Sequence, residues 1–450
     1  MMLLPEILLS SGTLGLILVN CLTRIKRQVS ISLGVMLLTL LAVIWGNQGS
    51  QALFVVDTLS RFCQGIILIL SMWVLANSHF TKEQSSFVCI LLLLAVLGAM
   101  VIVSAKSWLL LYTGLELIAL PVYALCVINH DKKASEAGLK YFVMGVIASI
   151  LILYGISFFY LVSSSLFYQS VGFITDVSMV WYLNLAIVFL LAGMSFKFGL
   201  APFHMWVPDI YQSAPISVVY WLAIVPKVAF LGMLIRLLQM TEIMQVLVTG
   251  QILWFIGLFS IIYGVLMATQ QSNIRRLIAY ASIAHMGFVM LPLQLGSAEG
   301  YTGSMIYLLG YVLTTLVAFS VVQILTRKGI VSIKDLRGIS HALPHESFAL
   351  LLSLAAMAGI PPLVGFVVKL NVFYLLIQAN YVATSVIAVI FVAVSAYYYM
   401  GIVRAMYFTD GKKGVIGTNY TIVFLGGLLV VSGIIPQTFL LQLTQIISGI

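Results

Sequence analysis

The sequence predicts an all-α polytopic membrane protein with about fourteen transmembrane helices, and two observations carry this prediction. Hydrophobic residues make up 62% of the 450 residues and charged residues only 8%, a balance that soluble proteins of this size do not show. The apolar residues also form continuous runs of about 20, the length that a helix needs to cross a bilayer. A transmembrane barrel would show short segments of alternating polarity instead.

The apolar runs are joined by mostly short connections without a low-complexity linker or a soluble module. Residues 1–450 therefore form a single integral membrane domain. We expect spans near residues 7–23, 29–47, 55–76, 87–105, 107–129, 137–163, 180–201, 214–238, 247–269, 276–296, 302–326, 347–378 (interrupted), 383–407 and 418–441.

Basic residues cluster in alternate connections between these spans, which all lie on one side of the membrane. By the positive-inside rule this richer side is cytoplasmic. The opposite side holds little more than Arg61, Lys106 and Arg236, so we expect both termini on the outer, periplasmic side. The net charge of +9 is thus spread between spans and does not indicate a nucleic-acid partner. The cytoplasmic set comprises Arg24, Lys26, Arg27, Lys82, Lys132, Lys133, Arg275, Arg276, Arg327, Lys328, Lys334, Arg337, Arg404, Lys412 and Lys413.

The first residues, MMLLPEILLSSG, lack the basic region and the cleavage site of a signal peptide, so we expect a retained first span. The cysteines Cys21, Cys63, Cys89 and Cys126 are widely spaced and form no CxxC pair. They are typical of small core residues rather than of a disulfide framework or a metal site.

The stretch from Leu190 to Pro215 contains a lysine where a span should be apolar. Lys197 has no neighbouring charge and is followed by Pro202. A lysine at bilayer depth costs ~2.5–3.5 kcal/mol, and the proline clashes with the carbonyl of Phe198. We expect a helix broken beside a buried cation, in the protein interior or along a watery cavity. The alternative is a lysine near a helix end whose amine reaches the headgroups.

Glu116 lies near the middle of the fifth expected span, with Pro121 five residues later to loosen the helix near Leu117. An ionised carboxylate in hydrocarbon is costly unless it protonates or finds a partner. We expect either a neutral acid hydrogen-bonded between helices or half of an ion pair with a lysine on a neighbouring helix. Lys140, one turn into the next helix, is shallower, and its amine could instead reach the headgroups.

Two more lysines accompany prolines. Lys227 directly follows Pro226, and Lys369 follows the segment GIPPLVG, which interrupts its span. A lysine near a proline break therefore occurs once in each half of the chain, at Lys197 and Lys369. Paired interrupted spans of this kind indicate a transport path built on repeats.

His285 lies within the apolar segment ASIAHMGFVM; it could relay protons or simply be a hydrogen-bonded core residue. His341, His345 and Glu346 have the spacing of a helical metal pair, but Pro344 interrupts them and no third ligand is nearby, which disfavours a metal site. Phosphate-binding glycine loops, nucleophile elbows and haem or flavin motifs are absent. We therefore expect no cofactor and no redox chemistry in this chain.

Five segments resemble the antiporter-like membrane subunits of respiratory complex I, the NADH:quinone oxidoreductase: TGLELIALPVYAL, FKFGLAPFHMWVPDIYQSAP, PKVAF, QSNIRRLIAYASIAHMG and GIPPLVGFVVKLNVFY. The resemblance extends from about the fourth span to the thirteenth and is greatest to the bacterial N-type branch, which is related to mitochondrial NADH dehydrogenase subunit 2. M-type members typically have glutamate at the position of Lys369. L-type members carry a long C-terminal amphipathic helix, whereas this chain ends just after its last span.

The resemblance implies two inverted five-helix repeats, each with a broken helix. It places N-terminal helices at about 1–80, a first repeat at 87–238, a second at 247–407 and a C-terminal helix at 418–441. It also implies a proton relay, whose members are Glu116 (the acid that pairs with a lysine), Lys197 (the broken-helix lysine), Lys140 (an additional lysine), Lys227 (the central connecting lysine), His285 (a relay histidine) and Lys369 (the outer lysine near the exit).

The implied function is proton translocation driven by electron transfer from NADH to quinone. NADH, FMN, iron–sulfur clusters and quinone would bind partner subunits, and the partners would be neighbouring antiporter-like and small membrane subunits and lipids. The implied location is a bacterial cytoplasmic membrane rather than a mitochondrial inner membrane. Two alternatives stay open: a subunit of a multi-subunit Na⁺/H⁺ antiporter or of a membrane-bound hydrogenase relative, and a membrane scaffold that does not conduct.

Overall fold

The structure is a computed structural model that describes residues 2–22, 27–51, 53–78, 80, 82–129, 131–168, 177–409 and 420–434. These residues are mostly helical, with one antiparallel pair of two-residue strands, β1 (Gly49–Ser50) and β2 (Val55–Val56). The α-helices are α1 (Leu4–Leu22), α2 (Gln28–Trp45), α3 (Thr58–Asn77), α4 (Lys82–Val103), α5 (Trp108–Cys126), α6 (Lys132–Ser163), α7 (Val177–Phe198), α8 (Trp206–Ser213), α9 (Ile216–Thr241), α10 (Leu247–Thr269), α11 (Ile274–Leu293), α12 (Ala298–Arg327), α13 (Pro344–Ala358), α14 (Val364–Gln378), α15 (Val382–Tyr407) and α16 (Tyr420–Ile434), and the 3₁₀ turns are η1 (Ile243–Gln245), η2 (Ile333–Leu336) and η3 (Ile339–His341).

Among the described residues, twelve helices are long and apolar enough to cross a membrane, and they match twelve of the fourteen expected spans one to one. The interrupted span is present as α13 and α14, each of 15 residues. The described part of the last span is α16. The all-α polytopic class is confirmed, whereas the count of fourteen is not. Residues 418–419 and 435–441 of the expected C-terminal helix lie outside the described residues, as do Arg24, Lys26, Lys412 and Lys413 of the orientation argument.

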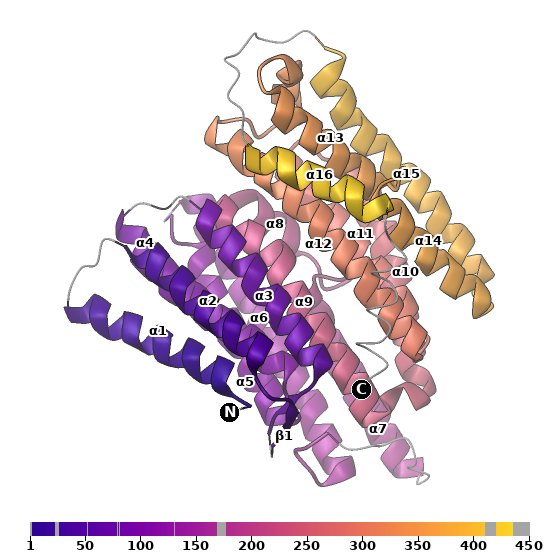
Figure 1. The fold of residues 1–450 in the computed structure, drawn as a ribbon. Coiled ribbons are helices and arrows are strands. Elements are labelled where there is room, and N and C mark those ends of the chain that lie inside the picture. The colour runs from indigo at the N-terminus through magenta and orange to yellow at the C-terminus, as the bar shows by residue number, and fades with distance from the viewer. Residues whose placement is uncertain are drawn as a thin grey trace. The chain divides into compact units, whose positions relative to one another are not determined.

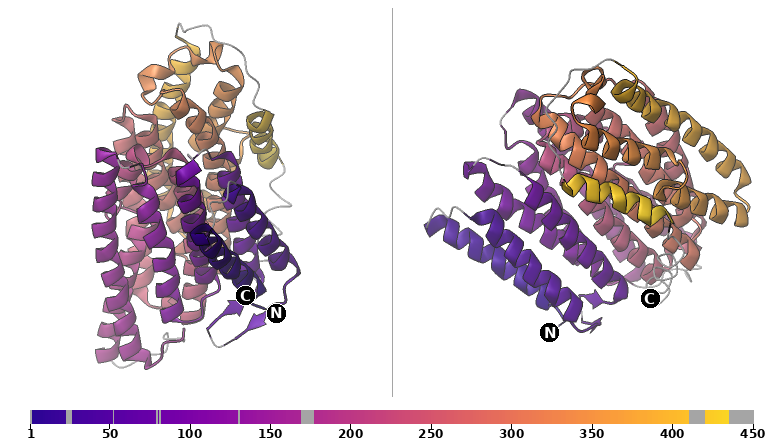
Figure 2. Two further views of the ribbon diagram at one scale, coloured as in Figure 1. Left: turned by 90° about the vertical axis from the view of Figure 1, so that its left-hand side faces the viewer. Right: turned by 45° about the horizontal axis from the view of Figure 1, so that its top comes forward.

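The chain divides into two compact units. The described part of the first lies within Met1–Phe198 and Ser213–Thr249. In it α1, α2, α3 and α4 lie side by side, and α9 packs on α3 and α4 (Figures 1 and 2). α6 and α7 approach closely because each carries a glycine at the contact: a Cβ at Gly193 would lie 2.6 Å from the Ala148 carbonyl oxygen, and one at Gly155 would lie 2.8 Å from the Leu190 amide nitrogen.

The described part of the second unit lies within Gly199–Gln212 and Gly250–Gln445. α11 and α12 form its buried centre, since 94% and 89% of their most apolar windows are buried. α14 packs on both of these helices, and α16 lies across α12, α13 and α14 (Figure 1). The repeat boundaries expected from the sequence remain a prediction.

Both expected helix breaks are present, and they are built alike. α7 ends at Phe198 and α13 at Ala358, and each is followed by a glycine with positive φ (+72° at Gly199, +89° at Gly359). A cis X–Pro bond follows in each break, at Pro202 in the first and at the second proline of GIPPLVG in the other. A residue with positive φ leaves the right-handed helical conformation and so ends the helix. Glycine adopts this conformation without the strain that other residues would meet.

The other two prolines in the argument do not break their helices. α5 continues through Pro121 and α9 through Pro226. Membrane helices tolerate a proline where neighbouring groups satisfy the freed carbonyl.

Arg236, counted above with the outer side, is a correction: it lies within α9 and is 1% exposed. Its guanidinium donates to the Asp57 carboxylate at 2.7 Å and to the Val103 carbonyl oxygen at 2.8 Å. Arg236 therefore fastens α9 to the start of α3 and says little about orientation. Because Arg236 lies near the end of an expected span, the sequence did not show that its side chain is buried.

Candidate functional site

Glu116, Ser149 and Lys197 form a polar cluster inside the first unit. The Lys197 Nζ lies 3.5 Å from Glu116 Oε1, and the Ser149 hydroxyl donates to the same carboxylate oxygen. Lys197 Nζ also lies 3.5 Å from the Ser149 hydroxyl oxygen. The lysine side chain is 6% exposed and the glutamate side chain 24%. The structure thus places Glu116 beside Lys197, a lysine on another helix.

Three helices position this cluster. Glu116 comes from α5, Ser149 from α6 and Lys197 from the last turn of α7. The last turn of a helix carries a partial negative charge from its free carbonyls, which favours a cation there. The close approach of α6 and α7 through their glycines is what brings the serine next to the lysine. A buried pair with one bridging hydroxyl can hold a proton and release it when its geometry changes.

Lys227 and Lys140 have different surroundings. Lys227 is 5% exposed on α9, a helix that is buried along its whole apolar window. The Lys140 Nζ lies 2.6 Å from Glu136 Oε1 on the same helix, and these side chains are 54% and 66% exposed. Lys140 and Ser149 both lie on α6, and Ser149 faces the cluster. At 3.6 residues per turn, a separation of nine residues places Lys140 on the opposite side of the helix. The structure therefore does not bring Lys140 to the Glu116–Lys197 pair, and its relay role stays a prediction.

His285 lies at the centre of the second unit, between two tyrosines. Its Nδ1 is 2.9 Å from the Tyr307 hydroxyl oxygen and its Nε2 is 3.3 Å from the Tyr399 hydroxyl oxygen. The histidine is 8% exposed and both tyrosines are 1% exposed. A neutral imidazole has one N–H and one bare nitrogen, so one tyrosine accepts from it and the other donates to it. Such a histidine can take a proton on one side and release one on the other.

Lys369 is 4% exposed and follows the second helix break. Its Nζ donates to the carbonyl oxygens of Met357 at 2.6 Å and Ala358 at 3.1 Å, which end α13. It also lies 5.8 Å from the centre of the Phe288 ring. Whereas a carboxylate neutralises Lys197, the free carbonyls of a helix end stabilise Lys369.

A small cavity of about 10 Å³ adjoins this lysine, lined by residues that include His285, Tyr307 and Lys369. That is close to the volume that one water needs. Within the described residues, no group of three His, Cys, Asp or Glu side chains could hold a metal ion, and His341, His345 and Glu346 belong to no such group.

The sequence argument missed Ser149, Tyr307 and Tyr399. Ser149 had no distinctive signal, because a small polar residue in an apolar helix commonly bonds to its own backbone. The tyrosine run at residues 397–399 was the one available pointer to Tyr399. A buried hydroxyl needs a partner, but the sequence does not say which.

The chain matches a known family and has close relatives among known proteins. Residues 105–395 match the family model described as NADH:quinone oxidoreductase/Mrp antiporter, TM. The chain is 36% identical over 435 residues to the NADH-quinone oxidoreductase subunit N of Ruthia magnifica subsp. Calyptogena magnifica, covering 91% of this chain and 89% of that one.

Two solved structures share the fold. A chain of respiratory complex I from Thermus thermophilus with bound Aureothin superposes with a TM-score of 0.84 at 29% identity, covering 97% of this chain and 98% of that one. A chain of the Mrp complex from Dietzia sp. DQ12-45-1b superposes with a TM-score of 0.85 at 16% identity, covering 99% and 96%.

Proposed function

This chain belongs to the NADH:quinone oxidoreductase/Mrp antiporter membrane family, and we propose that it is the proton-translocating N-type subunit of a bacterial NADH:quinone oxidoreductase. The 36% identity to a subunit N along nearly the whole chain supports this assignment. The Mrp complex, at 16% identity, shares the fold alone. The Na⁺/H⁺ antiporter alternative therefore receives no specific support.

The observation that carries the proposal is the Glu116–Ser149–Lys197 cluster beside a broken helix, in which the lysine is buried and the glutamate partly buried. With the carboxylate at 3.5 Å, the charged form of Lys197 is stabilised in surroundings that otherwise disfavour it. Moving the carboxylate away removes that stabilisation, so the lysine releases its proton. Returning the carboxylate favours uptake of the next proton.

The proposed relay continues from Lys197 to Lys227 and then to His285 and Lys369, with Lys140 as an additional lysine. These residues stand on different helices, so water must carry protons across the gaps between them. Quinone reduction in partner subunits would drive the opening and closing of the Glu116–Lys197 pair. NADH, FMN, iron–sulfur clusters and quinone are assigned to those partners.

The proposed partners are the other membrane subunits of the complex, including neighbouring antiporter-like and small membrane subunits. The proposed location is the bacterial cytoplasmic membrane, with both termini on the periplasmic side. This orientation rests on the positive-inside rule, because most basic residues lie in connections on one side of the spans.

The test is NADH-driven proton uptake and quinone reduction in membrane vesicles that carry Lys197→Met, with assembly checked on a native gel. Methionine keeps the length of the side chain and removes its charge. We expect assembly to hold while both activities collapse. The matched control is Lys334→Met, an exposed lysine in η2, which should retain both. Wild-type activities with Lys197→Met would instead favour the non-conducting scaffold.

A further inference from the structure

We propose that Tyr398, Tyr399 and Tyr307 form a hydroxyl path that brings protons from a cytoplasmic cleft in the second unit to His285 and on to Lys369. The inference rests on the proposed function, because it gives the His285–Lys369 part of that relay an access route. It assigns roles to three tyrosines that the relay itself does not use.

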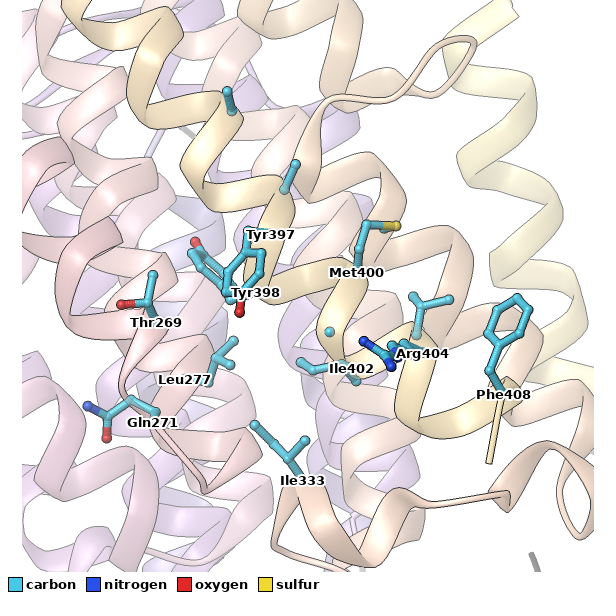
Figure 3. A pocket seen from close by; sticks show the side chains of 14 residues that line it. Thr269, Gln271, Leu277, Ile333, Tyr397, Tyr398, Met400, Ile402, Arg404 and Phe408 are labelled. Carbon is cyan, nitrogen blue, oxygen red and sulfur yellow. The ribbon is translucent and has the colours of Figure 1, made fainter. Parts of the chain in front are cut away.

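The route begins at a cleft of about 1030 Å³ between α15 and the ends of α10, α11 and η2. Thr269 and Gln271 line one side of it and Arg404 the other, with Tyr398 between them (Figure 3). Most of the other lining residues are apolar, so water in the cleft would bond at these polar groups. Arg404 belongs to the basic set that marks the cytoplasmic side.

Tyr398 connects the cleft to the interior. It lines the cleft yet is 6% exposed, and its ring lies beside that of Tyr399, with ring centres 4.4 Å apart and ring planes tilted by 52°. The Tyr399 hydroxyl reaches His285 Nε2 at 3.3 Å, and the other nitrogen of this histidine reaches the Tyr307 hydroxyl at 2.9 Å. Four polar side chains from α15, α11 and α12 thus follow one another from the cleft inward.

The last gap has the size of one water. The cavity of about 10 Å³ touches His285, Tyr307 and Lys369, so one water molecule there can bond to the Tyr307 hydroxyl and to the lysine amine. Tyr311 and Thr314 complete its polar lining.

Each hydroxyl both accepts and donates, so one proton can pass without leaving a tyrosine or the histidine ionised, and only the amine of Lys369 gains a charge. Tyr398 accepts a proton from cleft water and gives its own to Tyr399, which gives its own to His285 Nε2. The imidazole releases its Nδ1 proton to Tyr307, and Tyr307 gives its own through the cavity water to the neutral amine of Lys369. Rotation of the hydroxyls and a tautomer change of the imidazole restore the starting state.

The opposing interpretation is that these hydroxyls only satisfy a buried histidine. Replacement of Tyr398 and Tyr399 by phenylalanine separates the two, because the rings and their packing remain. The test uses the assembled enzyme in inside-out vesicles, where NADH oxidation and proton uptake are followed from pH 6 to pH 9. Loss of a positioned proton-transfer group slows the transfer ~100-fold or more. We expect coupled turnover to fall at least ~10-fold at alkaline pH, where protons are scarce, and less at acidic pH.

The matched control is Tyr374→Phe on α14, a tyrosine that is 59% exposed, which should behave as wild type. An unchanged rate and pH profile in Tyr398→Phe/Tyr399→Phe, with Lys197→Met inactive in the same membranes, overturns the hydroxyl path and leaves the proposed function standing. If Lys197→Met is also fully active, the proposed function fails as well.

A second measurement tests the side from which the cleft opens. Gly401 lines the cleft and has no heavy atom within 4 Å of where a Cβ would lie, so Gly401→Cys should be accommodated. In a Cys21→Ser background, which removes the exposed native cysteine, a membrane-impermeant maleimide should label this cysteine in inside-out vesicles and not in spheroplasts. Labelling from the spheroplast side alone overturns the cytoplasmic route.

Discussion

Replacement of Glu116 by glutamine removes one charge from the central pair and changes the shape of the side chain very little. The amide can still bond to the Ser149 hydroxyl, which now donates to the Glu116 carboxylate. Lys197 then keeps its place but loses the carboxylate at 3.5 Å. The substitution therefore isolates the electrostatic part of the proposed switch.

The magnitude follows from that distance. With an effective dielectric constant of about 20, two opposite charges 3.5 Å apart attract by ~5 kcal/mol. Doubling the separation halves this energy, so opening the pair changes the stability of the charged lysine by ~2.4 kcal/mol. That corresponds to roughly 50-fold in an equilibrium constant. In Glu116→Gln this difference between the open and closed states is lost.

The assay is NADH-driven proton uptake and quinone reduction in inside-out vesicles, expressed as protons taken up per NADH oxidised. We expect Glu116→Gln to lower both coupled rates at least ~10-fold, a part of the 50-fold that the switch provides. Glu299→Gln is the control, because Glu299 is an exposed acid in the first turn of α12, outside the cluster. An assembled Glu116→Gln enzyme that oxidises NADH with an unchanged proton ratio would refute the switch.

Three further predictions concern the surroundings of the site. Ser149→Ala removes the hydroxyl that bridges the central pair. We expect coupled proton uptake in the same vesicle assay to fall ~10-fold or more, as for a lost hydrogen bond of ~1.5 kcal/mol or more to a charged group. Gly365→Ala would place a Cβ against the Ala356 carbonyl oxygen, which no flexible side chain can relieve; overpacking of this kind costs ~1–3 kcal/mol or more, and a native gel should show less assembled complex. Asp57→Asn breaks the ion pair with Arg236 and should cost ~3–5 kcal/mol of stability, seen as a lower unfolding temperature. Burial alone would raise the pKa of Asp57, but the hydrogen bond and charge of Arg236 lower this pKa below its ordinary value. The stability that the ion pair contributes is therefore present above the unfolded pKa of ~3.9 and is lost as pH falls through the lower folded pKa. Wild type and Asp57→Asn should thus converge in unfolding temperature only in strong acid.

Much of the fold was predictable, because bilayer depth imposes a length and a composition on each span. Twelve expected spans coincide with helices in the described residues. The two breaks were predictable for a local reason, since proline and glycine act on the backbone within a few residues of their own position. Prolines alone were a weaker guide: α5 and α9 pass through theirs.

The site divides in the same way. The buried positions of Lys197, Lys227, His285 and Lys369 were expected from the sequence, because an ionisable residue within a membrane span usually faces the protein interior. Lys140, near the start of its span, is exposed instead. The sequence also suggested a lysine partner for Glu116. Its resemblance to a known family then supplied the roles.

The identities of the partners depended on the tertiary structure. Glu116 and Ser149 are 33 residues apart, and His285 and Tyr399 are 114 residues apart. Helical periodicity states which residues share one face of one helix, but not which faces of two helices meet. For that reason the sequence predicted that Lys197, Lys227, His285 and Lys369 are buried and missed the burial of Arg236. The packing of α5 on α6, of α6 on α7 and of α11 on α12, with Tyr399 of α15 against His285, decided which hydroxyls and carboxylates these side chains contact.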